Sequence, residues 1–261
     1  TITELYDVLV QQDIALREIA AILRCDLSLM ISLFEINLLQ DCFSIPSSLL
    51  VYCPFLLDAP DSARWKQFAE REHFLSIGNF LHAPNRDAVQ WLKQQIWPRI
   101  RAQLPQAQLH VYGAYTPRAV REMHSVRDGF LVQGWTEDAL DSMMQARVCL
   151  APLRFGAGIK GKLADALLTG TPSVTTSIGA EAMHASLPWP GAVADDAETF
   201  SSEAVRLYRD ENAWHEAQQQ CQPLVQHCFD KRQHGDVLLT ALQVTRDNLV
   251  RHRLHNFTGR M

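Results

Sequence analysis

The chain has 261 residues, of which 47% are hydrophobic and 20% charged, as in an ordinary globular protein. A formal net charge of -5 argues against binding nucleic acid by neutralising its phosphates, and no apolar run has transmembrane length. The six cysteines form no CxxC pair and the ten histidines show no metal-ligand spacing. With no basic-then-apolar signal peptide at the start, we expect a cytoplasmic protein with reduced thiols and no metal.

The first part of the chain shows two helical and two strand patterns before a polar stretch. Periodicity predicts, in order, a helix, a strand, a helix and a strand, over residues 4–23, 26–32, 33–43 and 47–55. The polar residues 58–71 resemble a linker. We therefore expect a first segment over residues 1–58 and a second domain over residues 59–261.

From residue 73 onward strands and helices alternate regularly. The patterns predict strands over 73–78, 107–113, 129–134, 148–153 and 172–176, separated by helices over 85–104, 116–125, 136–147 and 163–168. A short apolar run over 191–195 follows, and the tail from Glu198 is helical. This alternation predicts an α/β fold, a Rossmann-like parallel sheet with helices on both faces, beside a partial second α/β segment. Such sheets bind ligands at the carboxyl ends of the strands.

The stretch "VCLAPLRFGAGIKGKLADALLTGTPSVTT", residues 148–176, places glycines and basic residues at the carboxyl end of a predicted strand. Glycine lets the main chain approach a ligand closely, and amides at the start of a helix point at an anion. The loop is therefore expected to bind a phosphate.

Three interpretations of this loop stay open from the residues alone. Its glycines match GxGxxG, but a dinucleotide fingerprint normally follows the first strand of its sheet. With Lys162 they match the start of a Walker A loop, yet Leu163 stands where a hydroxyl should meet Mg²⁺. The third interpretation is a nucleoside diphosphate, whose pyrophosphate is held by amides and basic side chains and whose ribose hydroxyls donate to Asp165.

Three motifs in order carry a resemblance to a known family: "IGNF" followed by "HAPN", then "APLRFGAGIKGK", then "GTPSVTTSIGAE". From about Phe74 to Met183 the chain resembles the nucleotide-sugar domain of the retaining, GT-B-fold glycosyltransferases of family 4 (group 1). Residues 1–58 resemble the closing elements of the other, acceptor-binding domain. The resemblance implies retaining transfer of a hexose from a nucleotide-diphosphate sugar to an acceptor hydroxyl, in polysaccharide or lipopolysaccharide biosynthesis. We expect the 261-residue chain alone to transfer poorly, because most of the acceptor domain would lie outside it.

The resemblance also assigns site residues. The residues implied to bind the donor pyrophosphate are Arg154, Gly158, Ile159, Lys160 and Lys162. Asp165 is implied for the ribose and Trp135 for the base region, while the turns facing the sugar and phosphates would be formed by Gly78, Asn79, Asn85 and Glu181. His82 is a weak candidate for a catalytic group. Ala157 departs from the family pattern, because it replaces the first acid of E-x7-E.

Several of these residues have simpler structural interpretations. Arg154 could be a solvated loop charge, and Asp165 a carboxylate favoured by the helix dipole in a first turn. Asn85 is a natural N-cap for the helix that follows it, and Trp135 could be an aromatic packed over the sheet edge.

The expected partners are a nucleotide-sugar donor and a carbohydrate or lipid-linked acceptor, with no nucleic acid and no cofactor. Peripheral contact with the inner face of a membrane, through the missing domain, is a further expectation of the resemblance. Two other functions stay open: a non-catalytic nucleotide-binding or assembly module, and a nucleotide-sugar epimerase on the same architecture.

Overall fold

The computed structural model describes residues 13–256, and the internal contacts of the chain define two compact units. Unit 1 comprises Thr1–Asp58 and Phe229–Met261, and unit 2 comprises Ala59–Cys228. The segment Phe229–Met261 therefore belongs to unit 1, whereas we expected it in a second domain over 59–261. Its backbone pairs with the end of the first segment, since the Leu57 amide donates to the Phe229 carbonyl at 2.8 Å. An amphipathic pattern predicts that a helix has a buried face but not which segment covers it.

Unit 1 is a small α/β assembly. Its elements are α2 (Asp13–Arg24), β1 (Ser28–Met30), α3 (Leu33–Phe43), β2 (Leu50–Tyr52), α12 (Lys231–Asp247) and α13 (Leu249–His255). The two strands pair in parallel, with Ser28 opposite Leu50. The predicted helix over 4–23 is seen from Asp13 onward, and residues 4–12 lie outside the described part. An ion pair between Arg253 and Asp26 (2.6 Å) joins α13 to the start of β1.

Unit 2 is built on one parallel sheet of six strands. These are β3 (Phe74–Ile77), β4 (Leu109–Tyr112), β5 (Phe130–Gly134), β6 (Val148–Ala151), β7 (Ser173–Thr175) and β8 (Gly191–Val193). Their order across the sheet is β5-β4-β3-β6-β7-β8, so the direction of winding reverses between β3 and β6. The predicted parallel α/β sheet is confirmed, and the reversal marks where such sheets bind ligands.

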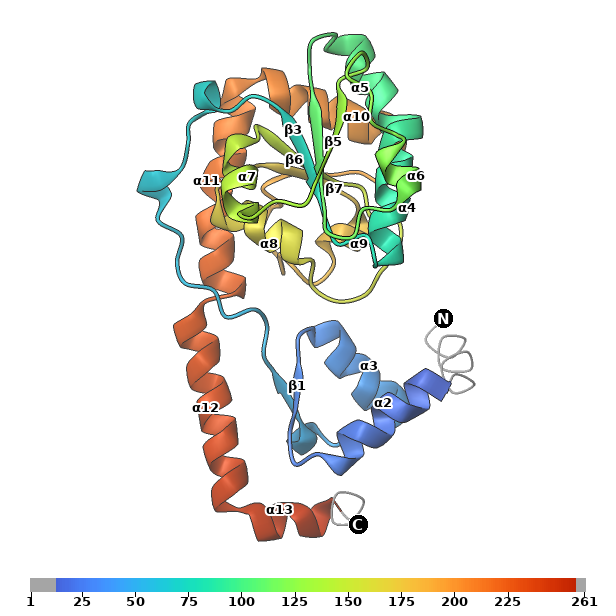
Figure 1. Cartoon of the computed structure of the whole chain (residues 1–261). Coiled ribbons are helices and arrows are strands. Elements are labelled where there is room, and N and C mark those ends of the chain that lie inside the picture. The colour runs from blue at the N-terminus through green and yellow to red at the C-terminus, as the bar shows by residue number, and fades with distance from the viewer. Residues whose placement is uncertain (1–12, 257–261) are drawn as a thin grey trace. The chain divides into compact units, whose positions relative to one another are not determined.

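Helices cover both faces of this sheet. They are α4 (Ala83–Trp91), α5 (Trp97–Gln103), α6 (Arg118–Arg121), α7 (Ala139–Gln145), α8 (Gly161–Leu168), α9 (Ser177–Ala180), α10 (Ala197–Arg209) and α11 (Glu211–Cys228). Figure 1 shows α4, α5, α6 and α10 on one side of the strands and α7, α8 and α11 on the other. The single helix predicted over 85–104 is instead α4 and α5 joined by a π-helical turn, Leu92–Ile96. Pro98 has no amide hydrogen to continue the α-helical ladder, which explains the interruption.

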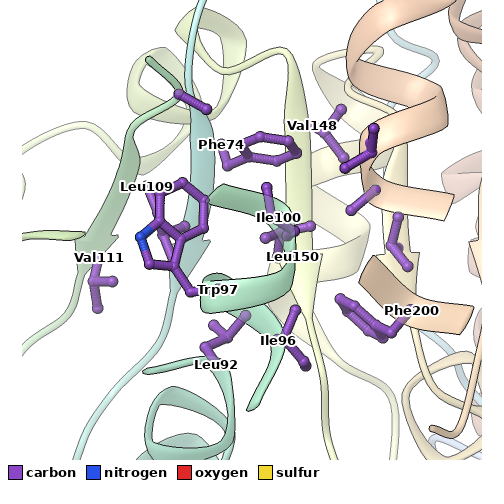
Figure 2. Packing of buried hydrophobic residues seen from close by; sticks show 14 of the residues in the cluster. Phe74, Leu92, Ile96, Trp97, Ile100, Leu109, Val111, Val148, Leu150 and Phe200 are labelled. Atoms are coloured by element: carbon purple, nitrogen blue, oxygen red, sulfur yellow. The ribbon is translucent and has the colours of Figure 1, made fainter. Parts of the chain in front are cut away.

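Alternation along the strands divides the core of unit 2 between the two faces. Phe74 and Val148 belong to a large cluster with Trp97, Ile100 and Phe200 from the helices (Figure 2). The next residues along each strand, Leu75 and Cys149, belong to a smaller cluster that includes Met143 and Ala166. Both faces are apolar, as expected for a parallel sheet covered on both sides.

Residues 58–71 are not a linker, contrary to our prediction from their polar composition. Trp65 is buried and its indole donates to the Leu168 carbonyl at 2.8 Å. Arg71 is fully buried, and its guanidinium donates to the Thr169 carbonyl (2.7 Å), the Thr171 hydroxyl (2.6 Å) and two further carbonyls. Polar composition did not predict this burial, because an arginine can be buried when main-chain carbonyls accept hydrogen bonds from its guanidinium.

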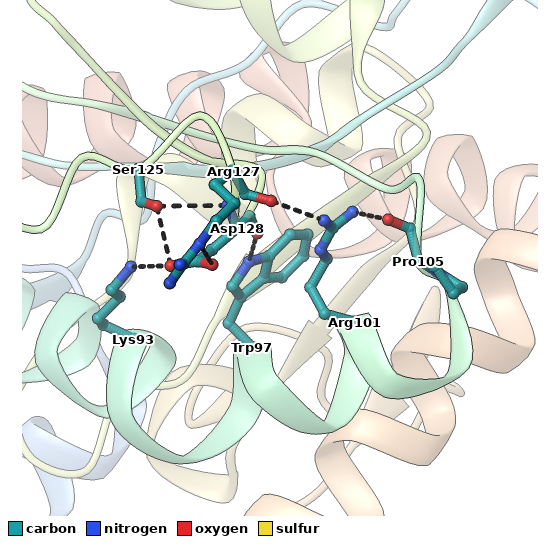
Figure 3. A network of polar contacts seen from close by, with 7 residues as sticks. All are labelled: Lys93, Trp97, Arg101, Pro105, Ser125, Arg127 and Asp128. Atoms are coloured by element: carbon teal, nitrogen blue, oxygen red, sulfur yellow. Dashed lines mark hydrogen bonds and ion pairs between the residues drawn. The ribbon is translucent and has the colours of Figure 1, made fainter.

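A polar network fixes the loops that precede β4 and β5 (Figure 3). The Trp97 indole donates to the Asp128 carbonyl at 2.7 Å, and Ser125 donates to the Asp128 carboxylate at 2.8 Å. The Arg101 guanidinium donates to the carbonyls of Ala107 (3.0 Å) and Arg127 (3.1 Å). Because these loops lie at the amino ends of the strands, the network supports the sheet from the edge opposite to the candidate site.

Candidate functional site

The candidate site lies at the carboxyl ends of β3 and β6, where the strand order reverses. β3 is followed by a turn over residues 78–82, and β6 is followed by the glycine-rich loop over 152–160. The two strands are neighbours, with Phe74 opposite Val148, so the turn and the loop lie side by side. α8 begins at Gly161 with Lys160 as its N-cap, which directs its first amides toward this edge.

Lys162, in the first turn of α8, is joined to α4 by a hydrogen bond. Its ammonium donates to the side-chain oxygen of Asn85 at 2.6 Å, and the Asn85 amide donates to the Asn79 carbonyl at 2.7 Å. Burial of the ammonium lowers the pKa of Lys162 to about 8. A Cβ added at Gly78 would lie 2.7 Å from Asn85 Cγ, so this turn needs glycine. Gly78, Asn79, Asn85 and Lys162 therefore form one contiguous group.

Asn85 is not the N-cap of the helix, contrary to our structural interpretation. His82 holds that position, and Asn85 is the third residue of α4. The exposed His82 side chain makes no capping hydrogen bond. The cap shifted because Pro84 occupies the second helical position, where its fixed φ favours an earlier start.

Lys160 is buried and contacts the glycine-rich loop itself. Its ammonium donates to the carbonyls of Gly156 (3.3 Å) and Gly158. Gly156 and Gly158 have φ values of 127° and 73°, which side-chain-bearing residues rarely adopt. The lysine and the two glycines together define the shape of the loop, and Ile159 between them is half-buried.

Arg154 is an exposed residue of the loop, as its interpretation as a solvated charge implies, and it also forms an ion pair. Its guanidinium donates hydrogen bonds to both carboxylate oxygens of Asp87, with Nε 2.8 Å from Oδ2. The guanidinium also lies 5.4 Å from the centre of the Trp91 ring. Asp87 was not predicted as a site residue. The available signal was a carboxylate two residues after Asn85 on the same helix.

Asp165 is the fifth residue of α8, so it lies beyond the first turn, and our interpretation as a dipole-favoured carboxylate is wrong. The side chain is half-buried, and this burial raises the pKa of its carboxyl. Beneath it, burial raises the pKa of Cys149 to about 12, so that thiol is neutral at physiological pH.

Two of the expected residues follow other strands of the sheet. Trp135 follows β5, which β4 separates from β3, and its side chain is 67% exposed, so the interpretation as a packed aromatic is wrong. Glu181 is exposed at the end of α9, beyond β7. The structure therefore brings together the residues of the β3 turn, α4 and the β6–α8 loop.

Within residues 13–256, no group of three or more histidine, cysteine, aspartate or glutamate side chains is placed to hold a metal ion. In the same part of the chain, no helix combines the length and the apolar character needed to cross a bilayer.

Comparison with known proteins gives a family and a fold. Residues 71–210 match a family model described as Glycosyl transferases group 1. No curated protein matches the sequence. Similar solved structures include TarM of S. aureus, crystallised with UDP, fondaparinux and alpha-GlcNAc-glycerol, with a TM-score of 0.70 and 9% identity. The alignment covers 88% of this chain and 46% of TarM.

Two further structures show the same fold. The pneumococcal O-GlcNAc transferase GtfA, crystallised with UDP and GlcNAc, has a TM-score of 0.65 and 15% identity, over 89% of this chain and 47% of GtfA. WaaG, a glycosyltransferase involved in lipopolysaccharide biosynthesis, has a TM-score of 0.57 and 16% identity, over 75% of this chain and 57% of WaaG. The chain thus spans less than half the length of TarM and GtfA.

Proposed function

Because the chain belongs to the glycosyl transferases group 1 family, we propose that unit 2 binds a nucleotide-diphosphate sugar for retaining transfer of a hexose to an acceptor hydroxyl. The observation that carries the proposal is the desolvated Lys162 ammonium, held beside the amino end of α8 where the strand order reverses. TarM and GtfA, which share the fold, were both crystallised with UDP.

The proposed chemistry follows from the charges at the loop. When the bond between the sugar C1 and the diphosphate oxygen breaks, negative charge grows on the diphosphate. A new bond forms from C1 to the acceptor oxygen, whose proton passes to the leaving diphosphate or to water. The α8 amides and Lys162 would stabilise the leaving diphosphate, and Asp165 would accept from the ribose hydroxyls. We propose that this requires no resident metal or other cofactor.

The proposed setting is polysaccharide or lipopolysaccharide biosynthesis, with a carbohydrate or lipid-linked acceptor. This part rests on WaaG, a fold neighbour involved in lipopolysaccharide biosynthesis. The proposal includes a cytoplasmic location, peripheral to the inner face of the membrane.

Thermal unfolding with added nucleotides tests the donor site. UDP, GDP, ADP, NAD and ATP are each added with and without Mg²⁺, and a ligand at 100 times its Kd adds about 2.7 kcal/mol of stability. We expect one diphosphate to raise the Tm without needing Mg²⁺. Lys162→Met should abolish this increase, whereas Arg206→Met, which removes an exposed charge on α10, should retain it.

The remaining outcomes distinguish the other interpretations. A response to NAD alone would indicate a dinucleotide site, a response to Mg·ATP alone a Walker-type site, and no response would contradict the proposal. Slow release of sugar from a bound donor would separate an enzyme from a non-catalytic module. Conversion of the donor sugar without any acceptor would identify an epimerase.

A further inference from the structure

The first turns of α4 support the glycine-rich loop through side chains. Asn85 accepts a hydrogen bond from Lys162, and Asp87 binds Arg154. Gly156 also packs close to this helix, because a Cβ added there would lie 3.3 Å from Pro84 Cγ. Lys162 and Arg154 are thus held by two different kinds of side-chain acceptor on α4, an amide and a carboxylate.

The Asn85 amide is fixed in one orientation by its contacts. Its nitrogen donates to the Asn79 carbonyl at 2.7 Å, and its oxygen accepts from the Lys162 ammonium at 2.6 Å. Exchanging the oxygen and nitrogen would place an NH₂ group against the ammonium, where both groups can only donate. Gly78 lies against the same amide, because a Cβ added there would lie 2.7 Å from Asn85 Cγ.

The choice of an amide matters for charge. A carboxylate partner cancels the charge of a cation, as Asp87 does for Arg154, whereas an amide oxygen accepts the hydrogen bond and leaves the charge in place. The Lys162 ammonium is also desolvated, which disfavours its protonated form, and an acceptor offsets this effect. The Cys149 thiol on β6 faces Lys162 as well, but burial raises the pKa of Cys149, so the thiol is neutral and does not cancel the charge. Lys162 therefore remains a net positive charge beside the start of α8.

We infer that Asn85 is a positioning residue, which holds the Lys162 ammonium in place for a diphosphate and leaves its positive charge uncompensated. This inference rests on the proposed function, because it assigns Asn85 a role that acts through Lys162 on the same ligand. It differs from the expectation that Asn85 itself faces the sugar and phosphates.

Two variants of Asn85 and a control on the same helix test the inference. Asn85→Asp adds a carboxylate of nearly the same volume, Asn85→Ala removes the acceptor, and Gln90→Ala alters an exposed residue of α4. The first measurement needs no ligand: an NMR titration of lysines labelled with ¹³C at Cε. The chain has five lysines, and loss of a signal in Lys162→Met assigns Lys162.

The two Asn85 variants should shift the titration of Lys162 in opposite directions. A carboxylate favours the ammonium, so Asn85→Asp raises the pKa of Lys162, whereas loss of the acceptor in Asn85→Ala lowers it further. Gln90→Ala should leave it unchanged. Asn85→Asp keeps the measurement available if the alanine variant does not fold.

The second measurement is the Kd of UDP as a function of pH. At pH 7 both Asn85 variants should bind UDP about tenfold more weakly, the value expected when a hydrogen bond to a charged group is lost or its charge cancelled. The loss of affinity at alkaline pH should begin at lower pH in Asn85→Ala and at higher pH in Asn85→Asp. A merely structural role would weaken binding equally at every pH.

Each outcome decides one of the two proposals. If the pKa of Lys162 is the same in the wild type and both Asn85 variants, the role of Asn85 is overturned. If the wild-type chain binds none of UDP, GDP and ADP, the proposed function fails, and the lysine titration shows separately whether the contact with Asn85 exists. Opposite pKa shifts together with weaker UDP binding would support the inference.

Discussion

At the scale of single residues, Arg71 shows how a buried charge stabilises unit 2. Burial lowers the pKa of Arg71 to about 10, so the guanidinium remains protonated at neutral pH. Its hydrogen bonds join residue 66, the β6 approach at Ala146 and the turn after α8 at Thr169. One side chain therefore ties together three segments far apart in sequence.

Replacing Arg71 should destabilise the protein strongly. Arg71→Met leaves several buried acceptors unpaired and should lower the free energy of unfolding by about 3 kcal/mol or more. Arg71→Lys should lose less, because it keeps the charge but not the planar fork of donors. Urea unfolding measures both, with Arg99→Met on the exposed face of α5 as the control. Equal stability of Arg71→Met and the wild type would contradict this role.

The imidazoles of His73 and His110 predict an acid-sensitive stability. Their rings stack with centroids 3.8 Å apart, and burial, with the neighbouring His110, lowers the pKa of His73 to about 4. Burial also lowers the pKa of His110. Below about pH 6.5 these two histidines bind protons in the unfolded chain but not in the folded chain. The free energy of unfolding therefore falls as the pH falls toward 4.

Urea unfolding between pH 4.5 and 7.5 tests this prediction. Because carboxylates also titrate toward the acid end, the relevant quantity is the difference between the wild type and His73→Phe. This difference should change most between pH 6.5 and 4.5, and exposed His227→Gln should give no such change. A wild-type profile parallel to that of His73→Phe would show that His73 does not contribute.

At the scale of elements, two glycines should respond to alanine with opposite signs. Gly170 follows α8 with φ 59°, and an added Cβ would lie 2.4 Å from the Trp65 ring, so Gly170→Ala should destabilise by more than about 1 kcal/mol. Gly235 lies inside α12 with nothing within 4 Å of an added Cβ. Gly235→Ala should stabilise by about 0.5–1 kcal/mol. Urea unfolding measures the stability of both variants. A change of the same sign in the free energy of unfolding of both would contradict this prediction.

The elements also show what the sequence could predict. β3 to β7 fall where local patterns placed them, because alternating apolar runs and helical periodicity depend on neighbours in the chain. The break between α4 and α5 depends on Pro98, a local signal in the sequence from which the break could have been predicted. The partner of α12 and the burial of Arg71 depend on contacts distant in sequence, which leave no local pattern.

The candidate site divides in the same way. The glycine-rich loop and its place after a strand could be predicted, because glycine composition and an apolar strand pattern are local features of the sequence. The hydrogen bond between Asn85 and Lys162 was not, because it joins residues 77 positions apart. The pairing of Arg154 with Asp87 was hidden for the same reason.

At the scale of the whole molecule, the division into two units predicts where binding resides. The β3 turn, α4 and the β6–α8 loop all belong to unit 2, which carries the complete six-stranded sheet. A fragment of residues 59–228 should therefore bind the same diphosphate as the full chain, with a similar Kd by calorimetry. If the fragment unfolds cooperatively but does not bind while the full chain does, the site requires unit 1.

During synthesis the strands of unit 2 emerge in an order that differs from their order in the sheet. β3 leaves the ribosome first and can pair with β4 and β5, but its other edge pairs with β6, which is made only after α7. Until then a newly made chain carries β3, with Phe74 and Leu75, as an open and apolar edge strand. Because the first strand is central, we expect the half-made domain to be prone to aggregation through this open edge.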